Sequence, residues 1–195
     1  MCISYEFKGT PVSLSERFGV EIPPDLPEKT VMWPTDKALV MTHDGFRISN
    51  WGLPSPWDGK PIVNARAETL DQKPTFKPLL EQRCVAPASA YFEWRHEGRK
   101  KLKNRIMLEN DDLFAMAGLT DGTHFTIITC KPAASIEHIH NRMPVLLTPE
   151  GAEGWLNPQP RFSGVAHLLV PYQGSSLTYI EDTPEPAPQG NLFGS

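Results

Sequence analysis

Apolar and polar residues alternate in short runs along most of the chain, a pattern typical of half-buried β-strands. Ala38–Met41 and Phe46–Trp51 flank His43-Asp44-Gly45, and a second Asp-Gly turn separates Leu113–Leu119 from His124–Cys130. Both arrangements predict β-hairpins, because Asp-Gly adopts the tight turns that join antiparallel strands.

Two more apolar runs, Ala90–Trp94 and Leu102–Leu108, predict a third hairpin across a basic HEGRKK turn. Val165–Val170 is also interpreted as a strand. Signals for helices are fewer and shorter, so the pattern predicts an α+β fold, mainly antiparallel β-sheet with a few short helices.

The clearest helix signal is Thr148-Pro149-Glu150, which predicts a helix to about Leu156 with Thr as N-cap and Pro in the first turn. Ser13–Gly19 predicts a short helix, and Pro132–His140 predicts a further helical turn.

The length of 195 residues fits one domain with an ample core. Because the sequence from about Glu181 is rich in Pro and polar residues, we expect a folded domain over 1–175 and a flexible tail over 176–195. No apolar run approaches roughly 18 residues and the start lacks a secretory pattern, so neither a membrane span nor a signal peptide is predicted. Three widely spaced cysteines indicate a reducing, cytoplasmic location.

The formal net charge is -4, which argues against a general affinity for nucleic acid. However, residues Trp94–Arg105 (WRHEGRKKLKNR) hold six Lys and Arg residues against the single acid Glu97. Taken alone, this run is more typical of a solvated hairpin than of a DNA-binding surface.

The start of the chain, Met1-Cys2, offers unusual chemistry. If Met1 is removed, Cys2 carries a free α-amine beside its thiol. Such a 1,2-aminothiol forms a Schiff base with an aldehyde and then closes into a durable thiazolidine ring. Ordinary pKa values of roughly 7.7–8.0 and 8.5 leave both groups partly available near neutral pH. Without other signals, a Cys at position 2 would be an accident of the N-terminus.

Three internal segments carry further candidate groups. In Val63–Thr69, alternation places Asn64, Arg66 and Glu68 on one face of an extended segment. Taken alone, that face is more typical of the solvent side of an edge strand than of a binding surface.

Glu93 lies between aromatic residues, which would raise its carboxyl pKa and suit it to general acid/base work, although an outward-facing strand residue fits the segment equally well. His138 and His140 lack further metal ligands nearby, so we expect no metal site and no cofactor, and a single His as proton donor is simpler.

These segments, in this order, resemble the SOS response-associated peptidase (SRAP) family over roughly residues 1–172. The marks are Met1-Cys2, Trp51–Trp57, Val63–Thr69, Phe76–Trp94 and His138–Glu150. The family includes proteins that covalently trap abasic sites in single-stranded DNA, and its peptidase label fits self-cleavage of the N-terminus.

The resemblance implies that Cys2, Asn64, Glu93 and His140 form the active site. It also implies that the partner is single-stranded DNA with an abasic site, captured as a thiazolidine crosslink in the cytoplasm at the nucleoid. Contacts to DNA are expected from Trp57, Arg66, Trp94, Arg99, Lys100, Lys101 and Arg142. The chain departs from the usual Met-Cys-Gly-Arg-Phe opening at Ile3 and Ser4.

The tail sequence Gln189-Gly190-Asn191-Leu192-Phe193 resembles the peptide by which bacterial repair proteins dock on the replication sliding clamp. Gln189 would form hydrogen bonds, and Leu192 and Phe193 would fill an apolar pocket. Two other functions stay open at this point: an N-terminal-nucleophile amidohydrolase or peptidase, and a non-catalytic single-strand DNA-binding module.

Overall fold

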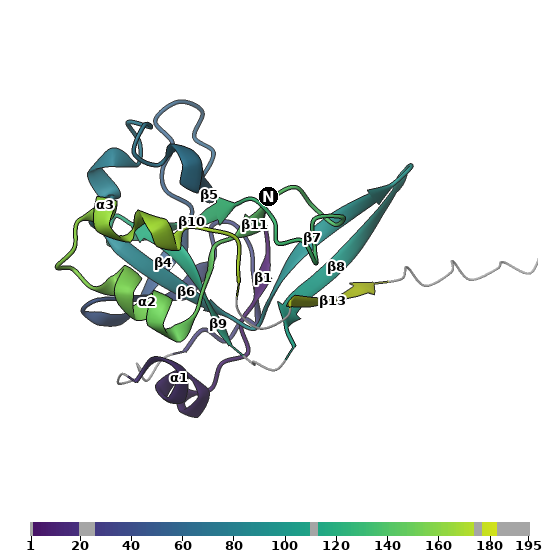
Figure 1. The fold of residues 1–195 in the computed structure, drawn as a ribbon, viewed down its shortest axis with the longest axis horizontal. Coiled ribbons are helices and arrows are strands. Elements are labelled where there is room, and N and C mark those ends of the chain that lie inside the picture. Colours follow the sequence, from purple (N-terminus) through teal and green to yellow (C-terminus); the bar gives the residue numbers. More distant parts are fainter. Residues whose placement is uncertain (1, 20–25, 110–112, 174–176, 183–195) are drawn as a thin grey trace, which may run out of the picture.

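The computed structural model of the chain describes residues 2–19, 26–109, 113–173 and 177–182. Two β-sheets form its centre, and short helices lie along the outside of the larger one (Figure 1). Most neighbouring strands run antiparallel, which confirms the predicted α+β class. No helix among the described residues is long and apolar enough to cross a membrane.

The first sheet has five strands in the order β13-β8-β7-β1-β2, and every pairing in it is antiparallel. Its long β7–β8 hairpin projects away from the rest of the molecule (Figure 1). The strands are β1 (Tyr5–Glu6), β2 (Val31–Met32), β7 (Ala90–Glu97), β8 (Lys100–Leu108) and β13 (Leu177–Asp182).

The second sheet has the order β11-β10-β4-β3-β6-β9-β12, and β5 also pairs with β10. Because β10 pairs with β9 on one side and β4 on the other, these strands close into a small barrel. The strands are β3 (Lys37–Thr42), β4 (Gly45–Trp51), β5 (Asn64–Arg66), β6 (Arg83–Ala88), β9 (Phe114–Thr120), β10 (His124–Cys130), β11 (Met143–Pro144) and β12 (Leu146–Leu147).

The barrel closes tightly at Gly118, where β9 lies between β6 and β10. A Cβ at this position would lie 2.7 Å from the backbone oxygen of Thr126 and 3.0 Å from Sγ of Cys84. Because real Cβ atoms do not approach a backbone oxygen so closely, the seam requires glycine here.

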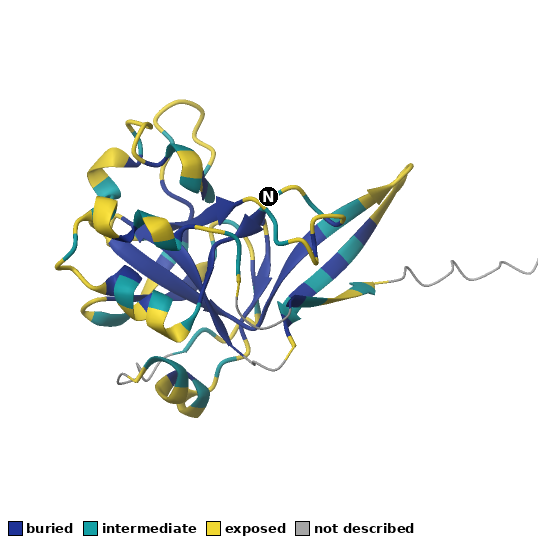
Figure 2. Cartoon of the chain, in the orientation of Figure 1, coloured by how far each residue is buried: buried dark blue, intermediate teal, exposed yellow. Residues whose placement is uncertain are grey.

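Most strand residues of the larger sheet are buried, as is the inner half of β7, whereas β8 alternates between buried and half-buried positions and the hairpin end is exposed (Figure 2). Tyr5 of β1 meets Trp51 edge-on at a centroid distance of 5.1 Å, and Trp51 stacks with Phe125 at 6.4 Å. Trp51 Nε1 also donates to the backbone oxygen of Val63 at 3.0 Å, one residue before β5. The aromatic cluster therefore fixes the N-terminal strand and β5 to the same core.

The predicted hairpins are confirmed: β3–β4, β7–β8 and β9–β10 pair as expected. The basic hairpin is longer than predicted, since its strands reach Glu97 and Lys100 and only Gly98 and Arg99 form the turn. Gly98 has φ +59°, a left-handed conformation that glycine adopts at little cost.

The predicted helix at Thr148 is also confirmed as α2 (Pro149–Leu156), with Thr148 Oγ1 accepting from Gly151 N at 3.1 Å. The helix predicted at Ser13–Gly19 begins slightly earlier, as α1 (Pro11–Phe18). A capping box starts it, because Thr10 and Ser13 each accept a hydrogen bond from the other's backbone N–H.

Two predicted elements were wrong. Val165–Val170 is not a strand, because its residues end α3 (Phe162–Val165) and form a 3₁₀ turn, Ala166–Leu168. The apolar residues of this segment pack against α2 through the edge-on contact of Phe162 with Trp155, and a short apolar run does not distinguish helix from strand.

Pro132–His140 forms turns rather than helix, since its backbone bonds, such as Ile139 N–H to Ile136 O, span three residues. Besides Ala166–Leu168, short 3₁₀ segments are found at Ala67–Thr69 and Lys77–Leu79.

Strand β13 lies within the segment predicted as a flexible tail. It pairs with β8 along its whole length, so the sheet continues to Asp182. Glu181 and Asp182 suit this place, because Glu181 binds Arg95 and Asp182 lies 3.7 Å from Lys103. The predicted clamp-binding residues Gln189, Leu192 and Phe193 lie outside the described residues.

Candidate active site

The N-terminal strand brings Cys2 into the interior between the two sheets. β1 pairs with β7 and β2, and just before it Phe92 N–H donates to the backbone oxygen of Ser4 at 3.0 Å. Cys2 is fully buried, and its Sγ lies 3.5 Å from the same Ser4 oxygen. Burial raises the pKa of the Cys2 thiol well above its usual range, so the thiol holds its proton at neutral pH.

Asn64 reaches Cys2 from the barrel. It begins β5, which runs parallel to β10 and pairs Asn64 with Ile127. Its Nδ2 donates to the backbone oxygen of Cys2 at 2.7 Å, across 62 residues of sequence. This bond fixes the position of the second residue of the chain.

Glu93 lies on β7 with only 2% of its surface exposed. Burial raises its pKa to about 7, as its aromatic neighbours in the sequence predict. A carboxyl with this pKa exists in both forms near neutral pH, so it can accept a proton and return it within one reaction.

His140 approaches Glu93 from the turn segment that precedes β11. Its Nδ1 lies 3.8 Å from Oε1 of Glu93 and accepts a hydrogen bond from Arg142 N–H at 3.1 Å. Burial lowers the pKa of His140, which favours the neutral ring at pH 7. Nδ1 also lies 3.2 Å from the backbone oxygen of Arg142, so the contacts fit either neutral tautomer. In the tautomer whose Nδ1 accepts from Arg142 N–H, the ring carries its proton on Nε2, where it can donate to a substrate.

A bidentate ion pair joins the segments that carry Asn64 and His140. Arg142 Nη1 and Nη2 donate to the two carboxylate oxygens of Glu68 at 2.7 and 2.9 Å. Nη2 also donates to the backbone oxygen of Thr129 on β10, at 2.6 Å. This guanidinium therefore holds the site together, because three elements meet at it. The extended segment ends at Arg66, so the predicted common face of Asn64, Arg66 and Glu68 is wrong at Glu68, which lies in a 3₁₀ turn.

A cavity of about 280 Å³ opens beside these groups. Of the four predicted catalytic residues, Glu93 and His140 line it. Cys2 is buried next to the lining residue Ile3, and Asn64 binds the Cys2 carbonyl, so these two residues adjoin the cavity without lining it. Six residues line it: Ile3, Glu93, Trp94, His96, Lys101 and His140.

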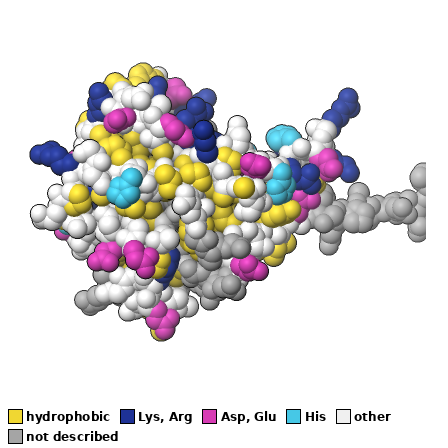
Figure 3. Space-filling view, in the orientation of Figure 1, with side chains coloured by type: hydrophobic (Ala, Val, Ile, Leu, Met, Phe, Trp, Pro, Cys, Tyr) yellow, Lys and Arg dark blue, Asp and Glu magenta, His cyan; other side chains and the backbone are white. Residues whose placement is uncertain are grey.

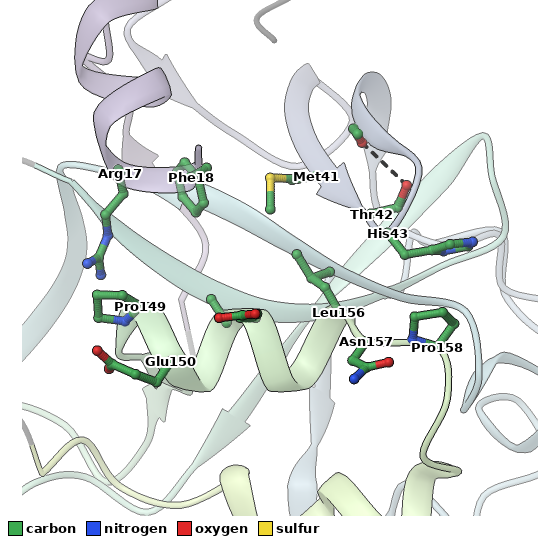
Figure 4. A pocket seen from close by; sticks show the side chains of 13 residues that line it. Arg17, Phe18, Met41, Thr42, His43, Pro149, Glu150, Leu156, Asn157 and Pro158 are labelled. Carbon is green, nitrogen blue, oxygen red and sulfur yellow. Dashed lines mark hydrogen bonds between the residues drawn. The ribbon is translucent and has the colours of Figure 1, made fainter. Parts of the chain in front are cut away.

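A larger cavity of about 550 Å³ lies between α1, the β3–β4 turn and α2 (Figure 4). Arg17 and Phe18 of α1 face Pro149 and Glu150 of α2 across it. None of the four predicted catalytic residues lines this cavity, so the smaller one is the candidate reaction site.

The residues predicted to contact DNA do not all lie at the cavity. Trp94 and Lys101 line it, whereas Arg99 and Lys100 stand at the exposed end of the hairpin. Trp57 is 73% exposed in the loop after β4. The others are Arg66, exposed at the end of β5, and Arg142, bound to Glu68.

His96 lies at the site but was not among the residues predicted from the sequence. It pairs across the hairpin with Lys101, and both line the cavity. Correct placement of the turn at Gly98 and Arg99 would have paired these two residues, because they are equally distant from it.

The first histidine of the His138-x-His140 pair lies elsewhere, since His138 packs edge-on against the ring of Tyr179 at 5.2 Å. Within the described ranges, no group of three or more His, Cys, Asp or Glu side chains has an arrangement that would hold a metal ion.

Fold and site together define a class of protein: a mainly antiparallel β domain that places a cysteine at the second position of the chain near a buried carboxyl and a histidine. The family model for SOS response associated peptidase (SRAP) matches residues 1–183. The chain belongs to this family.

Among curated relatives, abasic site processing protein YoqW of Bacillus subtilis (strain 168) is 39% identical over 167 residues, covering 74% of this chain and 74% of that protein. Abasic site processing protein YedK of Escherichia coli (strain K12) is 33% identical over 119 residues, covering 56% of this chain and 54% of YedK.

A crystal structure of a protein from Bacteroides thetaiotaomicron superposes with a TM-score of 0.82 at 27% identity, covering 94% of this chain and 93% of that one. A structure from Bordetella bronchiseptica gives 0.80 at 21% identity, covering 93% of this chain and 100% of that one, and shows the same fold.

Proposed function

We propose that this protein captures abasic sites in single-stranded DNA as a covalent crosslink to Cys2. The observation that carries the proposal is the 2.7 Å bond from Asn64 to the carbonyl of Cys2, beside the buried pair Glu93 and His140. The names of the relatives YoqW and YedK, abasic site processing proteins, support the same substrate.

The reaction begins when removal of Met1 turns the nitrogen of Cys2 into a primary amine. His140 donates the Nε2 proton to the ring oxygen of the abasic deoxyribose while Glu93 takes the proton of the C1′ hydroxyl, and the sugar opens to its aldehyde. The amine attacks C1′, water leaves, and an imine forms. The Cys2 sulfur then bonds to C1′ while the thiol proton passes to the imine nitrogen, closing a thiazolidine. No electrons are gained or lost overall, so no oxidant or reductant is needed.

Glu93 carries the protons between these steps. The buried Cys2 thiol has a raised pKa and needs a nearby base, and a carboxyl with a pKa of about 7 supplies one. The same carboxyl, once protonated, donates to the departing hydroxyl. Asn64 keeps the Cys2 carbonyl still, so that amine and thiol approach the same carbon.

The test is a heat-stable crosslink between the purified protein and a labelled single-stranded oligonucleotide with one abasic site. N-terminal mass spectrometry first establishes that Met1 is absent. Cys2→Ala should abolish the crosslink. Cys2→Ser keeps the amine and loses the thiol, so it should give only a Schiff base that borohydride traps and heat destroys.

Cys130→Ser is the matched control, because it removes another buried thiol and should leave the crosslink intact. A crosslink that survives in Cys2→Ala, or in a chain whose N-terminus is blocked, contradicts the proposal. An intact Met1 together with DNA binding would instead indicate a non-catalytic binding module.

A further inference from the structure

The β7–β8 hairpin carries two kinds of basic residue. Three of them are bound to carboxylates: Arg95 to Glu181, Lys103 to Asp182 and Arg105 to Glu6. His96 and Lys101 differ, because no carboxylate among the described residues lies within ion-pair distance of either. Figure 3 shows basic and histidine side chains gathered over this hairpin.

Position also separates His96 and Lys101 from Arg99 and Lys100, which likewise have no carboxylate within ion-pair distance among the described residues. His96 and Lys101 lie directly opposite each other on β7 and β8, and both line the 280 Å³ cavity that Glu93 and His140 share. Arg99 and Lys100 are equally exposed but lie beyond this cavity, at and beside the turn. Only one cross-strand pair of the basic run therefore faces the reaction site.

We propose that His96 and Lys101 form a phosphate subsite that binds the phosphodiester next to the captured abasic sugar. This inference rests on the proposed capture of abasic DNA and deepens it. Any deoxyribose that enters the cavity brings a phosphate to its mouth, because a phosphodiester is attached on each side of the sugar. Lys101 supplies the charge and His96 a ring N–H donor.

A positive charge at this place would also reduce the repulsion between the phosphate and Glu93. Glu93 lies deep in the same cavity and must be ionised for part of the reaction, so an unbalanced phosphate would repel it. A lysine at the mouth offsets that repulsion and orients the sugar by its phosphate. The paired cations Arg95, Lys103 and Arg105 are already neutralised by carboxylates and cannot do this.

The test measures binding without chemistry. The probe is labelled single-stranded DNA with a tetrahydrofuran residue, which has no aldehyde, and affinity is followed by fluorescence anisotropy at several salt concentrations. Lys101→Met should weaken binding about five- to tenfold and reduce the slope of log K against log salt by about 0.7, the share of one phosphate on a single strand. Lys101→Arg should keep most of the affinity, and His96→Ala should weaken binding less than Lys101→Met.

Lys37→Met is the control, since it removes the same charge from an exposed lysine on β3 that does not line the cavity, and it should change affinity less than twofold. Replacing the phosphate next to the tetrahydrofuran, on one side, by a neutral methylphosphonate should weaken wild-type binding and leave Lys101→Met binding unchanged. Equal effects of Lys37→Met and Lys101→Met would overturn the subsite. So would a methylphosphonate that, on whichever side of the tetrahydrofuran it is placed, weakens Lys101→Met binding as much as wild-type binding.

The two proposals fail separately. Loss of the heat-stable crosslink in the wild-type protein would remove covalent capture, whereas the tetrahydrofuran measurements would still decide whether Lys101 binds a phosphate.

Discussion

Burial of the Glu93 carboxyl should lower the stability of the folded protein at neutral pH, and Glu93→Gln should recover that stability while strongly slowing capture. Burial raises the pKa of Glu93 to about 7, against an ordinary value near 4.5. The folded protein therefore holds a proton that the unfolded chain releases. Since one pKa unit corresponds to about 1.4 kcal/mol, ionising Glu93 in the folded state costs roughly 3 kcal/mol.

The sign follows from proton linkage. Between pH 4.5 and 7 the folded state binds more protons than the unfolded state, so the free energy of unfolding falls as pH rises through this range. Above pH 7 the whole loss is present. Glutamine has nearly the same shape and no charge, so Glu93→Gln should be up to about 3 kcal/mol more stable than wild type at pH 8. At pH 4 the two proteins should differ little.

Urea unfolding followed by tryptophan fluorescence at half-unit steps from pH 4 to 8 measures this difference. Other titrating groups cancel in the wild-type-minus-variant curve. Glu137→Gln, which changes an exposed carboxyl, is the matched control and should alter stability by less than about 0.5 kcal/mol. Crosslinking by Glu93→Gln should fall about a hundredfold or more, since the proton carrier is lost. A difference curve that does not change with pH would refute the reasoning.

Four further changes test the framework of the site. Asn64→Ala should slow crosslinking about 10- to 100-fold by freeing the Cys2 carbonyl, with the protein still folded by circular dichroism. Gly118→Ala should lower the melting temperature by several degrees, because the added Cβ enters the barrel seam. Arg83→Met should cost about 3 kcal/mol in urea unfolding, since the buried guanidinium binds three backbone oxygens at the end of α2. Arg142→Lys should lose the two parallel hydrogen bonds to Glu68. Measured crosslinking rates should fall more in this variant than in Glu68→Gln.

The local features of this fold could be predicted from the sequence because each has a local physical cause. Thr148 and Pro149 determine where α2 begins, and Asp-Gly turns place the hairpins. The sequence also predicted a raised pKa for Glu93, and burial of the carboxyl on β7 raises it. Such signals act within a few residues, so a pattern read along the chain can find them.

Features that depend on distant pairing could not be predicted this way. Closure of the barrel through β10, and its parallel pairing with β4 and β5, join strands far apart in the sequence. The Arg142–Glu68 fork spans 74 residues, and neither residue signals its partner. Val165–Val170 was misassigned because packing on α2, and not its own pattern, decides its conformation.

The site itself depends on both local sequence and distant contacts. The sequence supplies the reactive groups, but their cooperation depends on three distant contacts: β1 against β7, Asn64 against Cys2, and His140 against Glu93. Each contact joins a different pair of elements, so a substitution in one should leave the other two intact. If the cluster acts as one unit in capture, combining Asn64→Ala with Glu93→Gln should slow crosslinking little more than Glu93→Gln alone, because groups that act together lose their effect together.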